Sequence, residues 1–186
     1  MTPRPATRRR YLHRAAAAVV AVATAGLVLA ACATHSGGPQ QAQQPVPHPR
    51  PAGPPAATLT TLAGKAVRVP GSKPTAVFFF SVGCGECAEG AKSFAKAATT
   101  VGGKAEFLAV DIDPHDSADA ITGFLRSIGS PDLPAAIDKD AVLSRTYQVS
   151  AISTLIVVDP AGKVTFRATD PPTDKIEATL TAAGAK

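Results

Sequence analysis

Two cysteines, Cys84 and Cys87, are separated by two residues in the stretch SVGCGECAEG, which spans residues 81–90. This spacing suits thiol–disulfide exchange, metal binding or a short structural disulfide. A structural disulfide is the weakest explanation, because closing so small a loop adds little stability. A closed zinc site needs four ligands, whereas the region predicted to fold holds these two cysteines and one histidine, His115. The sequence therefore favours thiol–disulfide exchange, and we expect His115 to be a solvated loop residue.

The two sulfurs are predicted to have different roles. We expect Cys84 at or near the N-cap of a helix, where free backbone N–H groups and the helix dipole favour a thiolate. Cys84 would then attack, and Cys87, one turn further and more buried, would resolve the mixed disulfide. The carboxylate of Glu86 opposes a second negative charge nearby. This opposition favours reduction or relay of disulfides over forceful oxidation.

The first 31 residues are typical of an export signal. Five arginines and no acidic residue precede an apolar run over residues 15–31, which is the pattern of a signal peptide. The run ends in LAAC, residues 29–32, which resembles the lipobox of bacterial lipoproteins. That resemblance implies cleavage before Cys32 and diacylation of Cys32, and two acyl chains anchor a protein stably. An ordinary secretory signal with a chance cysteine is the alternative.

The export route stays open. The stretch TRRRYLH, residues 7–13, resembles the twin-arginine export pattern, with Tyr11 in place of Phe and His13 in place of Lys. An ordinary basic segment on the general secretion route explains it equally well. Without the five signal arginines the remaining chain holds 14 basic and 14 acidic side chains. The basic charge thus belongs to the signal, which argues against a nucleic-acid partner.

The remaining chain divides into a tether and one domain. Residues 32–57 begin with Cys32 and continue as a Pro-rich segment without hydrophobic periodicity, which is typical of a linker. Residues 58–186 begin with a hairpin pattern in LTTLAGKAVRV. Buried runs predict strands over 75–80, 105–112, 133–138, 154–158 and 164–168, and spacing predicts helices over 85–101, 117–128, 140–147 and 173–183.

This order of elements predicts an α/β fold, in which a central mixed sheet is flanked by helices and preceded by an N-terminal β-hairpin. The turn signal DPAGK, residues 159–163, joins the last two predicted strands into a second hairpin. The cysteine pair follows the predicted strand 75–80 directly. Chemistry collects at the carboxyl ends of strands in such sheets, so the pair stands where a reactive site is expected.

The stretch FFFSVGCGECAEGAKSFAKAA resembles the strand–loop–helix that carries the active site of thioredoxin-like proteins. The stretch LPAAIDKDAVLSRTYQVSAISTLIVVDPAGKV is similar to the second half of the membrane-anchored TlpA/ResA-type branch. The likeness covers residues 58–186. It implies a thioredoxin-like fold and protein disulfide oxidoreductase activity with Cys84 and Cys87 as catalytic residues and no organic cofactor.

Three positions depart from the family's pattern. Gly83 replaces an aromatic residue, Glu86 replaces the proline found before the second cysteine in many members, and Ser153 stands where a cis-proline is usual. A cis bond before Ser153 would cost about 2.5–4 kcal/mol, so we expect a trans bond. The hydroxyl of Ser153 is then free to donate a hydrogen bond to a thiolate.

These observations leave three hypotheses. The first is a lipid-anchored oxidoreductase on the outer face of the bacterial cytoplasmic membrane. Its partners would be exported cysteine-containing proteins, a membrane electron donor, and the bilayer through acylated Cys32. The second is a metal-handling protein, with copper as the first choice because Cu(I) prefers soft thiolates. The third is a binding module whose cysteine pair is vestigial.

Overall fold

The computed structural model describes residues 53–186. The predicted signal, Cys32 and most of the predicted tether lie outside the described residues. None of the helices in this range has the length and apolarity needed to cross a bilayer.

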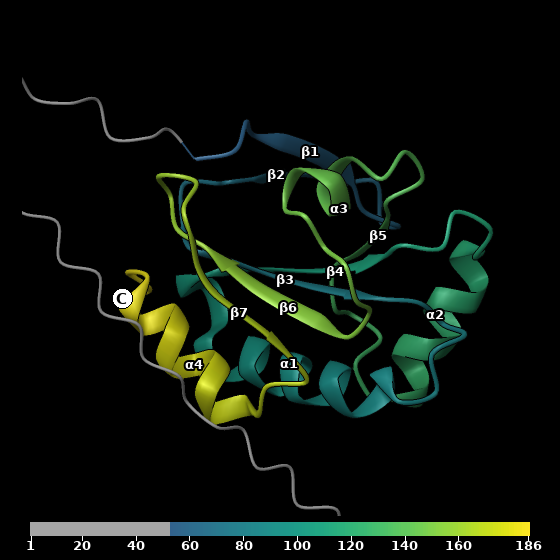
Figure 1. Cartoon of the computed structure of the whole chain (residues 1–186). Helices are drawn as coiled ribbons and strands as arrows, with labels where there is room; N and C mark the ends of the chain where they lie inside the picture. Colours follow the sequence, from purple (N-terminus) through teal and green to yellow (C-terminus); the bar gives the residue numbers. More distant parts are fainter. Residues whose placement is uncertain (1–52) are drawn as a thin grey trace, which may run out of the picture. The chain divides into compact units, whose positions relative to one another are not determined.

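A mixed five-stranded sheet forms the centre of the domain, with strand order β5-β4-β3-β6-β7 (Figure 1). Strands β3, β4 and β5 run parallel, while β6 runs antiparallel to both β3 and β7. The bounds are Thr75–Phe80 for β3, Glu106–Asp111 for β4, Ala135–Ile137 for β5, Thr154–Val158 for β6 and Val164–Thr169 for β7.

Different elements cover the two faces of the sheet. Helices α1 (Cys87–Val101), α2 (Ala118–Ser127) and α4 (Thr173–Ala182) supply one apolar cluster. The hairpin β1 (Ala57–Thr60) and β2 (Ala66–Val69), together with α3 (Val142–Thr146), supplies the other (Figure 1). The predicted α/β fold, with a mixed sheet, flanking helices and an N-terminal hairpin, is confirmed.

Strand β3 is the middle strand of the sheet, and all six of its residues are buried. Alternate side chains of a strand face opposite sides, and the three phenylalanines follow this rule. Phe78 stacks on Phe94 of α1 at 5.6 Å between ring centroids, and Phe80 stacks on Phe124 of α2 at 5.0 Å. Phe79 packs into the cluster under the hairpin. The carboxyl end of β3 is therefore fixed by packing on both faces.

Most element ends differ from the sequence prediction by one or two residues, and the end that matters is the start of α1. The prediction placed it at Gly85, but α1 begins at Cys87. The Cys84 N–H bonds to the Ser81 carbonyl at 3.0 Å, and the Cys87 N–H bonds to the Cys84 carbonyl at 3.1 Å. These successive turns occupy the residues before the helix. A short 3₁₀ helix at Gly102–Lys104 was not predicted.

Candidate active site

Cys84 and Cys87 form a disulfide between the end of β3 and the start of α1. Their Cα atoms lie 5.4 Å apart, within the usual range for a disulfide. Cys87 is fully buried, whereas Cys84 is half-buried. The sulfur that a partner can reach is therefore that of Cys84.

The helix start changes the predicted surroundings of both sulfurs. Glu86 is the N-cap of α1 and its exposed side chain makes no capping hydrogen bond. Cys84 thus lies two residues before the N-cap, and Cys87 is the first helical residue rather than one turn further in. One N–H still reaches the attacking sulfur, because Cys87 N donates to Cys84 Sγ at 3.1 Å. A charged acceptor strengthens such a bond, so it favours a thiolate at Cys84.

Ser153 precedes β6 and is buried. The peptide bond before Ser153 is trans, as predicted, because Val69–Pro70 is the only cis peptide bond within residues 53–186. The predicted hydrogen bond from Ser153 to a thiolate is wrong. The Ser153 hydroxyl donates to Oδ1 of Asp170, and Asp170 N donates back to the Ser153 carbonyl at 3.1 Å. The carboxylate is the stronger acceptor, and the β6–β7 hairpin brings it beside Ser153.

The Ser153–Asp170 pair packs on Gly90, in the first turn of α1. A Cβ at Gly90 would overlap Oδ1 of Asp170 and lie 3.0 Å from Oγ of Ser153. Glycine inside a helix costs about 1 kcal/mol relative to alanine, and here it admits this close approach. A carboxylate thereby rests on the same helical turn that begins with Cys87.

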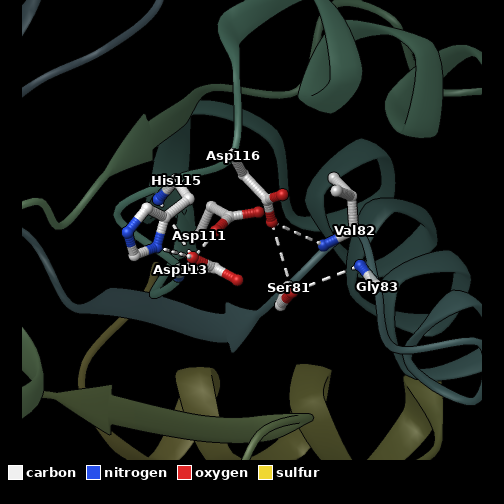
Figure 2. Close-up of polar contacts among 7 residues, drawn as sticks. All are labelled: Ser81, Val82, Gly83, Asp111, Asp113, His115 and Asp116. Carbon is white, nitrogen blue, oxygen red and sulfur yellow. Dashed lines mark hydrogen bonds and ion pairs between the residues drawn. The ribbon is translucent and has the colours of Figure 1, made fainter.

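Two further carboxylates, Asp111 and Asp116, lie near the segment Ser81–Gly83, which precedes Cys84 (Figure 2). Oδ2 of Asp116 accepts from the Ser81 hydroxyl at 3.2 Å and from Val82 N at 3.3 Å. Burial raises the pKa of Asp111 to about 6, against the lowering effect of the Asp113 N–H, and the neighbouring Asp116 adds to the rise. Sequence reasoning missed both residues, although Asp111 lies in a predicted strand.

His115 is an exposed loop residue, as predicted. Its side chain is 92% exposed and its Nδ1 lies 3.1 Å from Oδ1 of Asp113. Hydrogen bonds from the backbone and side chain of His115 lower the pKa of Asp113. Within residues 53–186 no group of three or more His, Cys, Asp and Glu side chains is placed to hold a metal ion.

Two surface cavities lie elsewhere on the domain. One, of about 410 Å³, is bordered by Leu62, Leu125 and Leu133, and the other, of about 510 Å³, by Leu62 and Val142. Neither includes a residue of the segment 81–90. The cysteine pair therefore lies outside these two cavities.

A Cys-x-x-Cys disulfide between the central strand of a mixed sheet and the following helix is the arrangement expected of a thioredoxin fold. Residues 71–164 match the model of a family described as thioredoxin-like. The chain belongs to the thioredoxin-like family.

The chain is similar in sequence to a Streptomyces protein and in fold to several solved structures. A Streptomyces lividans protein named "Mercury resistance operon ORF3" is 59% identical over 131 residues, which cover 69% of each chain. A secreted disulfide oxidoreductase of Mycobacterium tuberculosis shares the fold with a TM-score of 0.57 and 19% identity, covering 68% of this chain and 95% of its own. The exposed lipoprotein thioredoxin of Streptococcus pneumoniae gives 0.60 and 22%, covering 69% and 99%.

Proposed function

We propose that the protein is a lipid-anchored thiol–disulfide oxidoreductase on the outer face of the bacterial cytoplasmic membrane. It reduces or relays disulfides in exported proteins. The observation that carries the proposal is the asymmetry of the pair, in which Cys84 is half-buried and Cys87 fully buried. The signal-like residues 1–31 and the lipobox-like residues 29–32 support the location.

The exchange proceeds in two displacements. The Cys84 thiolate attacks one sulfur of a partner's disulfide, so that a mixed disulfide forms and the partner's other sulfur leaves as a thiolate. The Cys87 thiolate then attacks Cys84 Sγ, which forms the Cys84–Cys87 bond and releases the partner's second thiolate. Both partner thiolates take up protons, and two electrons have moved to the partner. A membrane dithiol donor returns the pair to its reduced state.

Accumulation of the mixed disulfide tests the proposal. The reduced full chain with Cys87→Ala is mixed with an oxidised cysteine-containing protein and run on a non-reducing gel. We expect an adduct, because the resolving sulfur is absent. Cys84→Ala is the matched control and should give none. An adduct of equal yield in both variants, or none in either, contradicts the proposal.

A second candidate function is the binding of a soft metal ion by the reduced pair. The observation that favours it is the relative at 59% identity whose name refers to a mercury resistance operon. Two thiolates suit Cu(I), the first choice from sequence, and equally Hg(II). Anaerobic titration of the reduced chain with each ion should show one ion bound per chain, lost on Cys84→Ser. The absence of binding by the unsubstituted chain rules out this candidate.

A further inference from the structure

Asp111 and Asp116 form a pair of carboxyl groups, called here the carboxyl pair, that the exchange steps do not use. Asp111 is fully buried at the end of β4. Its Oδ1 accepts from Asp113 N at 2.9 Å, but its Oδ2 has no hydrogen-bond partner among the described residues. An unpartnered buried carboxyl oxygen is rare and costly. The unpartnered Oδ2 of Asp111 therefore needs a physical explanation.

Asp111 lies next to the segment that leads from β3 to Cys84. Phe80 at the end of β3 pairs with Asp111 at the end of β4, which brings the two following loops together. Asp116 Oδ2 accepts from Ser81 Oγ and Val82 N, at 3.2 and 3.3 Å. Figure 2 shows these contacts, with the Asp111 side chain beside that of Asp116.

Hydrogen bonds of Ser81 connect Asp116 to the backbone of Gly83 and Cys84. Its hydroxyl accepts from Gly83 N at 3.2 Å, and its carbonyl accepts from Cys84 N at 3.0 Å. The hydroxyl therefore donates to Asp116 and accepts from Gly83, so both of its hydrogen-bonding functions are used. The segment Ser81–Gly83 is fixed to the β4–α2 loop through the carboxylate of Asp116.

The charged groups near the carboxyl pair determine which side chain can affect the protonation of Asp111. In the same loop, Asp113 and His115 pair with each other and are partly or largely exposed. On the β5 side, the Asp138 carboxylate is occupied by Ser144 N and Ser144 Oγ, both at 2.8 Å. From β3 and the segment that follows it, the contacts to the pair are Ser81 Oγ and Val82 N. Asp116 is therefore the charged side chain that faces Asp111.

We propose that Asp116 is a positioning residue for Cys84 and that the proton on Asp111 sets how firmly Asp116 holds the segment Ser81–Gly83. The inference rests on the proposed function and deepens it. With Asp111 protonated, Asp116 lies beside a neutral group and keeps its two hydrogen bonds. With Asp111 ionised, two carboxylates repel each other, and the restraint on the segment weakens. The reactivity of Cys84 then depends on a proton that neither cysteine carries.

The test compares Asp111→Asn with the unsubstituted chain, because Asn mimics the neutral carboxyl at every pH. The reduced full chains are alkylated with iodoacetamide between pH 4.5 and 8, and mass spectrometry gives the rate for the Cys84 peptide. We expect the variant-to-unsubstituted rate ratio to be near one below pH 5. It should rise up to about tenfold above pH 7, with a midpoint near 6, the value to which burial raises the pKa of Asp111. A ratio that does not change with pH overturns the inference.

Substitutions at Asp116 test the positioning step separately. Asp116→Ala removes the acceptor for Ser81 and Val82, and we expect alkylation of Cys84 to slow about tenfold. Asp116→Asn keeps an acceptor oxygen and should restore the rate. It should also abolish the pH-dependent effect of Asp111→Asn, which a merely structural role would not do. Equal rates for all three residues at position 116 overturn the inference.

The matched control is Asp113→Asn, which makes the same chemical change in the same loop without touching the segment Ser81–Gly83. It should leave the rate ratio near one at every pH, and a rise like that of Asp111→Asn would contradict the assignment. The alkylation rate measures the reactivity of Cys84 in the absence of any partner protein. A pH-independent ratio thus overturns this inference alone, whereas the Cys87→Ala adduct tests the exchange activity.

Discussion

At the scale of single residues, opposing influences act on the reactive sulfur. The Cys87 N–H at 3.1 Å from Cys84 Sγ favours a thiolate. Two carboxylates place negative charge in the same region. Glu86 lies between the two cysteines in sequence, and Asp170 packs against Gly90 in the first turn of α1. Like charges nearby disfavour a thiolate. This balance supports reduction or relay of disulfides, the direction that Glu86 alone indicated.

The contact between Gly90 and Asp170 gives a prediction about stability. Gly90→Ala places a methyl group against the carboxylate and 3.0 Å from Ser153 Oγ. Overpacking lowers the free energy of unfolding by about 1–3 kcal/mol, whereas the higher helix propensity of alanine raises it by about 1 kcal/mol. We expect a net loss of about 1 kcal/mol in the free energy of unfolding, measured with urea.

Gly123 in α2 supplies the matched control, because a Cβ there meets no atom within 4 Å. Gly123→Ala should stabilise the domain by about 1 kcal/mol. Removing the obstruction with Asp170→Ala should make the Gly90→Ala change less costly. Equal effects of alanine at positions 90 and 123 would show that the close approach at Gly90 has no energetic weight.

Asp111 gives a prediction about the pH dependence of stability. Burial raises its pKa from 3.8 to about 6, so the folded chain binds this proton more tightly than the unfolded chain. Its contribution is fully favourable below about pH 4 and is lost as the pH rises through about 6. Asp111→Asn should therefore stabilise the domain at pH 7, by about 2–3 kcal/mol, and by much less at pH 4.5. Urea unfolding at the two pH values measures this, and an equal effect at both contradicts it.

At the scale of elements, buried runs and turn signals were readable from the sequence. The strand over 154–158 was predicted with the bounds that β6 has. Helix α1 ends at residue 101, before Gly102 with φ 58°, and the turn Asp159–Lys163 joins β6 to β7, both at the predicted positions. Such features depend on neighbours in the chain, namely hydrophobic runs and glycine in left-handed conformations.

The polar contacts of the site could not be predicted in the same way. Asp116 meets Ser81 across 35 positions only because β3 and β4 pair in parallel. Ser153 meets Asp170 across the β6–β7 hairpin, where the register pairs their neighbours Thr154 and Thr169. These contacts depend on strand register, which local spacing does not specify. The carboxyl pair was therefore missed, and the hydroxyl of Ser153 was assigned the wrong acceptor.

The start of α2, which follows Asp116 directly, gives a prediction about an element. Ser117 is the N-cap of α2 and its side chain accepts from Ala120 N at 3.1 Å. Ser117→Ala should lower the free energy of unfolding by about 1 kcal/mol, because this N–H loses its partner. Ser127→Ala near the other end of α2 is the control, since Ser127 Oγ only bonds back to the Phe124 carbonyl. Comparable losses in urea unfolding for the two variants would contradict the capping role.

At the scale of the whole domain, the described chain begins far from the cysteine pair. Gly53 packs against Gly162, in the turn between β6 and β7. Because β6 is antiparallel to β3, this turn lies at the amino end of β3, where Val158 pairs with Thr75. Cys84 follows the opposite end of β3, about 20 Å away along a six-residue strand. A chain anchored through its N-terminal part would therefore attach at the end of the sheet opposite to the reactive sulfur.

This separation predicts that the anchor can be removed without changing the active site. In a bacterium that processes lipoproteins, Cys32→Ser should move the protein from the membrane fraction to the soluble fraction, because the proposed site of the two acyl chains is removed. The alkylation rate of Cys84 should stay the same, since the change lies outside residues 53–186. Cys84→Ser is the reciprocal control and should remain in the membrane fraction. Retention of the Cys32→Ser variant in the membrane would contradict lipid anchoring at this cysteine, and a changed alkylation rate would contradict the separation of anchor and active site.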